Sequence, residues 1–346
     1  MICFLPSNEY HTQTMASIVP HMESEHRSDY VFVDIEEHKK EGARETIARL
    51  GLPSVPYEEE MFANLPVGSA VVVMCDWSPW ERAAVIRARQ SGCATIGIVE
   101  GSQDWLDTHI EHLAARASFK PRYPYATVAE RLLLGSFDAR FVNGIVCGCA
   151  RFDPLVEQRP PLPDGPVACV HSNFTYNLYE DIRDRWVSSA VEAIESAGWD
   201  YFLIHHPRDR GDLSRYKLYP NDDLHEAISN CSVFITRFSS VNFDALLLGR
   251  RIVYYNPHGE RQPTFLEPMG AYPIIETARR LRNHLKRLQE DPGLGDVGSV
   301  KDDPSVRRFL QHHIGPLDGL AAQRSGQAIS RLARHYAASS ERTWKG

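Results

Sequence analysis

Residues Val233–Tyr255 read VFITRFSSVNFDALLLGRRIVYY, and this stretch decides the fold. The apolar run Val233–Thr236 predicts a buried parallel strand, and the β-branched run Ile252–Tyr255 predicts the next one. Between them, Val241–Leu248 has the spacing of a helix that ends at Gly249. Strand, turn, helix and strand in this order form a compressed βαβ unit, which predicts an α/β fold on a parallel sheet.

The turn before this helix carries Ser239 and Ser240. The first N–H groups of a helix lack helical partners and the helix dipole favours an anion, so the sequence predicts a phosphate-binding turn. Serine is also a preferred helix cap. Capping alone is therefore the alternative explanation for both serines.

The length of 346 residues predicts two domains, and a hydrophobic content of 43% is ample for two cores. No apolar run approaches the roughly 20 residues of a membrane span. The net charge of −7 argues against a nucleic-acid partner, which usually needs a basic surface. The seven cysteines contain no CxxC pair, which favours buried, reduced thiols in a cytoplasmic protein.

The first half alternates strands and helices, as in a parallel sheet with helices on both faces. Its predicted strands are Met1–Pro6, Tyr30–Asp34, Ala70–Cys75 and Ala94–Val99. The next segment predicts helices at Leu106–Ala117 and Val128–Leu134, and short strands at Ala139–Val142 and Ile145–Val146. The proline-rich run Gln158–Pro166 then predicts an interdomain linker.

Ligands of parallel sheets lie beyond the carboxyl ends of the strands, where this sequence places several carboxylates. Glu100, after the fourth strand, is the first candidate for a general base toward an acceptor hydroxyl, with Asp104 and then Asp76 as fallbacks. Trp77 and Trp80 are candidate platforms for the acceptor. The alternatives are a solvated turn, an ordinary loop, or a helix cap in the case of Asp104.

The second half opens with predicted strands at Val167–His171 and Tyr201–Ile204. The later strand runs into His205-His206-Pro207-Arg208, where a histidine and an arginine could bind a diphosphate or sugar hydroxyls. A basic surface loop is the alternative explanation. Adjacent side chains of a strand point to opposite faces, so we expect only one of the two histidines to serve a ligand.

Several common site motifs are absent from the sequence. There is no GxGxxG after the first strand and no GxxxxGK[ST], which removes the dinucleotide and P-loop fingerprints. GxSxG and HExxH are also absent, which argues against an α/β-hydrolase and a zinc protease. No metal site is needed to explain the histidines.

Four segments, in one order along the chain, carry a family resemblance. They are Gly148-x-x-Arg151-Phe152-Asp153, His206-Pro207, Thr236-x-x-Ser239-Ser240-Val241-x-Phe243-Asp244 and Asp318-Gly319-x-Ala321-x-x-Arg324. Together they resemble bacterial polymer transferases of the CDP-glycerol glycerophosphotransferase family and related capsule polysaccharide glycosyltransferases. The third segment is the most specific of the four.

This resemblance implies a GT-B fold, in which two Rossmann-like domains face a cleft. Residues 1–157 would form the acceptor domain, 165–318 the nucleotide-donor domain, and 319–346 a C-terminal helix returning to the first domain. The implied donor is CDP-, CMP- or UDP-linked, the acceptor is a saccharide or polyol, and neither cofactor nor metal is needed. The implied donor-binding residues are His206, Arg208, Arg237, Ser239, Ser240, Asp244 and Arg151.

The chain departs from the family pattern at three places. Arg237-Phe238 stands where the family has Asp-Tyr, and Ala150 stands where it has proline. Glu100-Gly101 stands where the family has His-Gly, whose histidine serves as a base. A carboxylate base, or a nucleotide-sugar donor in place of CDP-glycerol, is the implied adjustment.

We therefore expect an inverting, metal-independent transferase of surface-polysaccharide synthesis. It would be cytoplasmic, with peripheral contact at the inner membrane face as an open alternative. Glu100, its pKa raised by burial, would take the acceptor proton, while Ser239, Ser240, His206 and Arg237 meet the charge of the leaving phosphate. A UDP-sugar 2-epimerase-like enzyme and a non-catalytic GT-B-like nucleotide-binding protein are the alternatives.

Overall fold

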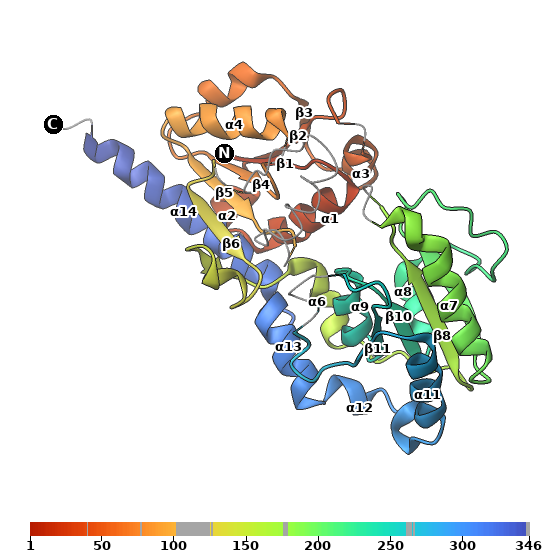
Figure 1. The fold of residues 1–346 in the computed structure, drawn as a ribbon. Helices are drawn as coiled ribbons and strands as arrows, with labels where there is room; N and C mark the ends of the chain where they lie inside the picture. Colours follow the sequence, from red (N-terminus) through yellow and green to blue (C-terminus); the bar gives the residue numbers. More distant parts are fainter. Residues whose placement is uncertain are drawn as a thin grey trace. The chain divides into compact units, whose positions relative to one another are not determined.

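The computed structural model describes residues 1–39, 41–76, 78–101, 125, 127–175, 179–260, 265 and 267–343. These residues divide into two compact units, each on its own parallel sheet (Figure 1). The described residues of 1–101, 125–154 and 311–343 form the first unit, and those of 155–310 form the second. The domain boundaries expected at 157, 165 and 318 stay predictions.

The first unit contains a seven-stranded parallel sheet in the order β3-β2-β1-β4-β5-β6-β7. The strands are β1 (Ile2–Leu5), β2 (Tyr30–Asp34), β3 (Ser54–Pro56), β4 (Ala70–Val73), β5 (Ala94–Ile98), β6 (Glu130–Leu133) and β7 (Ile145–Val146). In register, Ile2 lies beside both Tyr30 and Ala70, so β1 is an interior strand. The expected parallel pairing of these early strands is confirmed.

Long helices cover this sheet. They are α1 (Glu9–Ile18), α3 (Ala43–Arg49), α4 (Pro79–Gln90) and α14 (Ala321–Thr343). Strand side chains alternate between faces, and the apolar ones on one face, such as Phe4 and Val72, share a core with Met15 of α1 and Ile329 of α14. The C-terminal helix therefore belongs to the core of the first unit, as expected (Figure 1).

Two of the segments behind the family resemblance meet at the start of α14. The carboxylate of Asp153 accepts hydrogen bonds from the Ala321 and Ala322 N–H groups at 3.0 and 2.7 Å, which caps the helix. Arg324 donates to the Cys147 carbonyl at 2.7 Å. Gly148 has φ +89°, and a Cβ there would lie 3.0 Å from that of Ala321, so glycine suits both the backbone and the space.

Two predicted elements of the first unit are wrong. The expected helix Val128–Leu134 contains strand β6 instead. A short apolar run fits a strand as well as a buried helix, and here the segment forms a strand because it pairs with β5 on one side and β7 on the other. The expected strand Ala139–Val142 is a 3-10 turn, Asp138–Arg140. The predicted helix Leu106–Ala117 lies outside the described residues.

The second unit contains a five-stranded parallel sheet in the order β12-β11-β10-β8-β9. The strands are β8 (Val167–Ser172), β9 (Asp200–His205), β10 (Val233–Thr236), β11 (Arg251–Tyr255) and β12 (Ile274–Ile275). The predicted βαβ unit is confirmed as β10, α9 (Val241–Leu247) and β11. Its stop at Gly249 has φ +75°, a conformation that favours glycine.

Two amphipathic helices, α7 (Arg183–Glu195) and α11 (Ala278–Gln289), pack on one face of this sheet. Their core includes Trp186 and Leu281 against Val170 and Val253 of the strands. The remaining described helices and 3-10 turns are α2 (Ser24–Arg27), α6 (Asp153–Val156), α8 (Leu224–Ser229), α12 (Gly298–Lys301), α13 (Pro304–Ile314), Val19–His21, Glu59–Ala63, Ala150–Phe152, Glu180–Ile182 and Pro292–Gly295.

Basic side chains tie the proline-rich segment 158–166 to the second unit. The buried Arg250 donates to the Pro160 and Pro161 carbonyls at 3.1 and 2.8 Å. Lys301 donates to the Gln158 carbonyl at 2.5 Å, and the Ser232 hydroxyl donates to the Gly165 carbonyl at 3.1 Å. Hydrogen bonds therefore hold the segment expected to be a linker at several of its carbonyls. Among the described residues, no helix is both long and apolar enough to span a membrane.

Candidate functional site

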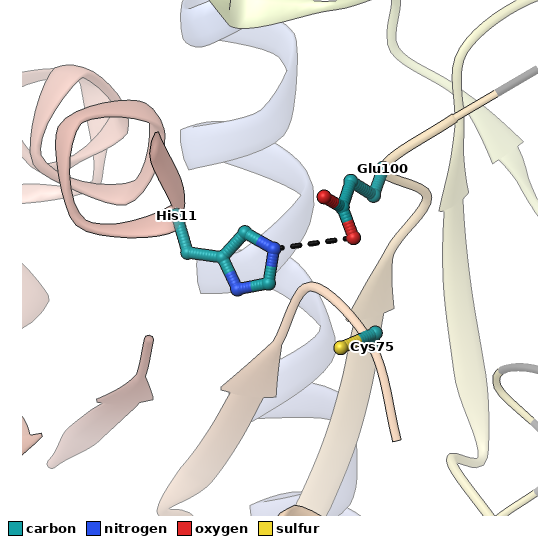
Figure 2. Close-up of side chains that lie close together, drawn as sticks. All are labelled: His11, Cys75 and Glu100. Carbon is teal, nitrogen blue, oxygen red and sulfur yellow. Dashed lines mark ion pairs between the residues drawn. The ribbon is translucent and has the colours of Figure 1, made fainter. Parts of the chain in front are cut away.

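The carboxyl ends of β4 and β5 carry the candidate residues of the first unit. Figure 2 shows the side chains of His11, Cys75 and Glu100 pointing toward one another. His11 comes from the first turns of α1, whereas Cys75 and Glu100 each follow a strand by two residues. Parallel strands end at one edge of a sheet, so residues far apart in sequence meet there.

His11 and Glu100 form a pair of a buried ring and a partly exposed carboxylate. Nε2 of His11 lies 3.2 Å from Oε2 of Glu100, and the side chains are 2% and 35% exposed. The Ser7 N–H donates to Nδ1 of His11 at 3.2 Å. Because Nδ1 accepts, the neutral ring carries its proton on Nε2, directed at Glu100.

The environment of Glu100 makes it an ionised carboxylate. Burial is the largest single influence and acts to raise the pKa of Glu100, but His11, Lys39 and Arg151 together outweigh it, so the net pKa lies below the usual value. The sequence-based expectation of a raised pKa is therefore wrong. The reason is a buried imidazole 89 positions earlier in the chain, which a strand-end argument does not reveal.

A second carboxylate, Glu81, is fully buried and supports this arrangement. Glu81 of α4 accepts hydrogen bonds from the Ser7 hydroxyl and from Lys39 Nζ, the latter at 3.0 Å. Burial alone would lower the pKa of Lys39, but the attraction of Glu81, together with smaller contributions from other neighbours, outweighs burial and raises the pKa. The same serine thus joins Glu81 to His11, which fixes the position of α1 against the strand ends.

The three side chains in Figure 2 are all of types that bind metal ions. One ligand atom from each of His11, Cys75 and Glu100 lies within 4.8 Å of the others. A zinc-bound histidine normally donates a hydrogen bond from its second nitrogen, whereas Nδ1 of His11 accepts one. The tautomer that satisfies Ser7 has no lone pair on Nε2, so we interpret the cluster as a histidine–carboxylate pair.

The other first-unit candidates have different environments. Asp76 is fully buried and accepts from the Tyr125 N–H at 2.7 Å and the Thr127 hydroxyl at 2.6 Å. It therefore anchors the chain before β6 and does not offer a solvent-accessible base. Trp80 stacks on the His38 ring with centroids 3.9 Å apart. Trp77 and Asp104 lie outside the described residues.

Arg151 was expected among the donor-binding residues, but it lies in the first unit. Its guanidinium stands over the rings of Tyr10 and Phe152, at 5.3 and 4.2 Å from their centroids. It contributes to the low pKa of Glu100. The structure thus groups Arg151 with the carboxylate candidate.

In the second unit, the carboxyl ends of β8, β9 and β10 meet. The His206 N–H donates to the Ser172 carbonyl at 2.8 Å, which joins the ends of β9 and β8. The buried Asp209 accepts from the Ser172 hydroxyl at 2.6 Å and from the Phe174 N–H at 3.1 Å, and it pairs with Arg183 of α7 at 2.7 Å. Sequence reasoning missed Asp209, although it closely follows the predicted histidine motif.

Two histidines occupy this edge. Nδ1 of His206 accepts from the Arg208 N–H at 3.1 Å, and burial followed by the Arg208 charge lowers its pKa. Its neutral ring therefore carries the proton on Nε2. His171, the penultimate residue of β8, is 2% exposed, and burial lowers its pKa to about 3. His171 was not singled out from the sequence, although its place near the end of a central strand is a usable signal.

The two serines of the predicted phosphate turn differ from each other. Ser239 is buried and lies one residue before the N-cap Ser240, and its hydroxyl accepts from the Val241 N–H, the first of α9, at 3.3 Å. Ser240 is exposed and makes no side-chain capping bond. The side chain of Asn173 donates to the Phe238 carbonyl of the same turn, which fixes the turn against β8.

Arg237 and Asp244 are both buried in the protein. The Arg237 guanidinium makes a 2.7 Å ion pair with Glu260 and stacks on Phe174 at 4.4 Å. Asp244 pairs with His225 of α8 at 2.9 Å. Direct contact with a donor was expected for both residues, but their side chains face partners within the protein.

Neither a protein-family model nor a curated protein sequence matches the chain. Solved structures are similar over nearly all of it. A proposed UDP-N-acetylglucosamine 2-epimerase from Listeria monocytogenes has a TM-score of 0.63, 15% identity and coverage of 96% of both chains. The glycotransferase of kitacinnamycin has a TM-score of 0.56, 16% identity and coverage of 96% of this chain and 98% of its own.

The wall teichoic acid polymerase TagF is also similar, with a TM-score of 0.53, 13% identity and coverage of 97% of this chain and 89% of its own. Identities this low establish the fold alone. The chain therefore has the GT-B fold, and the predicted fold class is confirmed.

Proposed function

We propose that this protein transfers a glycosyl or polyol-phosphate group from a CDP-, CMP- or UDP-linked donor to a hydroxyl acceptor in bacterial surface-polysaccharide synthesis. The observation that carries the proposal is the partly exposed carboxylate of Glu100, held by the buried His11 after β5. A fixed, ionised carboxylate at a strand end is suited to accept a proton from a hydroxyl.

In the proposed reaction, Glu100 accepts the proton of the acceptor hydroxyl as its oxygen attacks the activated carbon or phosphorus of the donor. The bond to the nucleotide phosphate breaks, and the phosphate oxygen leaves with the electron pair. In this proposal, neutral His206, with its proton on Nε2, and the exposed Ser240 donate to that oxygen. Arg208, also exposed, supplies a positive charge on the same loop.

The low pKa of Glu100 affects how it can act. A carboxylate with a pKa below 4.5 is a weak base, so its contribution must come from orientation and from proton transfer during the attack. The His11 contact supplies that orientation. Inversion at the reacting centre follows from a single displacement of this kind, and no metal step is required.

A UDP-sugar 2-epimerase-like activity is the second candidate. The similarity to the Listeria monocytogenes structure, with a TM-score of 0.63, favours considering it. An epimerase rearranges its nucleotide sugar without an acceptor, whereas a transferase releases nucleotide only when an acceptor is present. A nucleotide-binding protein without catalysis would bind a donor and change nothing.

Two measurements on the full chain test these candidates. A thermal-shift screen with CDP-glycerol, CMP-sugars and UDP-sugars identifies the donor, because a ligand at about 100 times its Kd adds about 2.7 kcal/mol of stability. Nucleotide release and donor isomerisation are then followed with and without saccharide or polyol acceptors. Acceptor-dependent release supports the transferase, and isomerisation without acceptor replaces it with the epimerase.

Glu100→Gln serves as the site-specific test, with Glu9→Gln on the exposed start of α1 as the matched control. We expect Glu100→Gln to leave donor affinity intact and to lower turnover by roughly 10²–10⁴. The control should retain wild-type turnover. Full activity of Glu100→Gln would remove the proposed base.

A further inference from the structure

A small cavity opens in the second unit, on the face of the sheet that α7 and α11 cover. Its volume is about 360 Å³, within the usual range for a small-molecule site. Ile182 and Pro257 supply apolar wall, and Arg185, Ser189, Tyr255 and His258 supply polar groups. None of these residues was singled out for donor or acceptor binding.

His258 is the most informative of the lining residues. Its side chain is 6% exposed, and Nε2 lies 2.9 Å from the Glu260 carboxylate. That carboxylate is ionised and accepts only, so Nε2 must donate, and in the neutral ring Nδ1 is left with a lone pair. Nδ1 is buried and has no hydrogen-bond partner among the described residues. A buried nitrogen without a partner is energetically costly, and an O–H or N–H group that reaches it from the cavity would satisfy it.

Arg185 adds a positive charge to the cavity lining. It is an exposed residue in the first turn of the 13-residue helix α7, whose N-cap residue, Ile182, offers no side-chain capping bond. Within the described part of the chain, its guanidinium has no ion-pair partner at bonding distance. A cation at a helix start favours an anionic group. The hydroxyls of Ser189 and Tyr255, 2.9 Å apart, complete the polar lining.

We propose that this cavity binds a small polyol phosphate, with the phosphate on Arg185 and a hydroxyl donating to Nδ1 of His258. The apolar wall accommodates the carbon chain between these two groups. Inorganic phosphate can contact Arg185 and can donate an O–H, but it has no carbon chain for the apolar wall, and an uncharged polyol lacks the anion that Arg185 favours. A molecule with an anionic group, a hydroxyl and a carbon chain matches all three parts of the lining.

Occupation of the cavity also affects the turn proposed to hold the donor, a consequence that rests on the proposed function. Glu260 accepts from His258, and it also binds Arg237 at 2.7 Å and the Phe238 N–H at 3.1 Å. A ligand hydroxyl on Nδ1 stabilises the tautomer that donates to Glu260. It thereby stabilises the conformation of the turn that carries Ser239 and Ser240, so nucleotide binding becomes tighter.

Calorimetric titration of the full chain with glycerol 3-phosphate tests the site, with inorganic phosphate and glycerol as partial probes. We expect glycerol 3-phosphate to bind with a Kd below about 10 mM and more tightly than either probe. Arg185→Gln should weaken it by about tenfold or more, because a charge-assisted contact is lost. The control is Arg287→Gln. Arg287 is exposed near the C-terminal end of α11, whereas the cavity is lined by Ala278 at the start of that helix, so this variant should bind glycerol 3-phosphate as the wild type does.

The outcomes separate this proposal from the proposed function. Absence of binding, equal binding of phosphate, or an equal loss in Arg287→Gln overturns the polyol phosphate site. Loss of glycerol 3-phosphate binding in Ser240→Ala would place the ligand at the donor turn and also overturn it. Unchanged nucleotide affinity in the presence of bound glycerol 3-phosphate overturns the coupling. Glycerol 3-phosphate binding without any nucleotide binding refutes the proposed function and leaves the cavity site standing.

Discussion

Arg237 and Glu260 form an ion pair in which both side chains are fully buried. Nε and one terminal nitrogen of Arg237 lie 2.8 and 2.7 Å from the same carboxylate oxygen. Glu260 also accepts hydrogen bonds from the Phe238 N–H and the Tyr254 hydroxyl. A carboxylate from the loop after β11 thus compensates the arginine that stands where the resembling family has an aspartate.

The first prediction follows from this pair. Glu260→Gln removes the countercharge of Arg237 in a buried place, and breaking a buried pair on one side typically costs about 3–5 kcal/mol. We expect a loss of that size in the free energy of unfolding of the second unit, measured by urea denaturation with a probe in that unit. The double variant Arg237→Gln with Glu260→Gln should recover much of the loss. A single variant as stable as the wild type would contradict the prediction.

The second prediction concerns acid stability and His171. Burial lowers its pKa from 6.5 to about 3 in the folded protein, so between these values the unfolded chain binds the extra proton. Stability is then complete above pH 6.5 and falls as the pH drops toward 3. By linkage, the loss at pH 4.5 is on the order of 2.7 kcal/mol.

Unfolding free energies of the wild type and His171→Gln at pH 7.5 and 4.5 check this. The variant should lose less stability than the wild type over that interval. His313 in the first unit has a pKa lowered in the same way, so its glutamine variant should act on the unfolding of the other unit. Equal pH dependence in wild type and His171→Gln would mean that this histidine does not titrate as stated.

The third prediction tests His11 as a positioning residue. Its contact lowers the pKa of Glu100, so His11→Gln should raise that pKa. A base works only when ionised, and the acid limb of the kcat/KM profile should therefore move to higher pH in the variant. A purely structural role would lower the rate at every pH without moving the limb.

The fourth prediction separates the two serines of the donor turn. Ser239→Ala removes the acceptor of the first N–H of α9 and should cost about 0.5–2 kcal/mol of stability. Ser240→Ala should leave stability unchanged and weaken nucleotide binding, because a hydroxyl donor to phosphate is lost. Denaturation should show a loss of stability in Ser239→Ala only, and calorimetry should show weaker nucleotide binding in Ser240→Ala. Unchanged nucleotide affinity in both variants would restrict the serines to capping.

Elements that neighbouring residues encode were predictable, whereas features that depend on distant residues were not. The stretch β10–α9–β11 was predictable almost residue by residue, because its strands, turn and helix stop are encoded by neighbouring residues. Strand β6 was not, since its short apolar run acquires its structure from β5 and β7. The position of Glu100 was predictable, but its pKa depends on His11, a residue far away in the sequence.

The return of α14 to the first unit has a consequence for synthesis on the ribosome. Strands β1 to β5 emerge early, yet the core they form includes Ile329 and Ala333, and Asp153 caps a helix that begins at Ala321. The segment 155–310 leaves the ribosome before that helix does. The second unit can thus reach its native packing first, while the earlier-made sheet waits with an apolar face uncovered, so this face is where a chaperone would bind the growing chain.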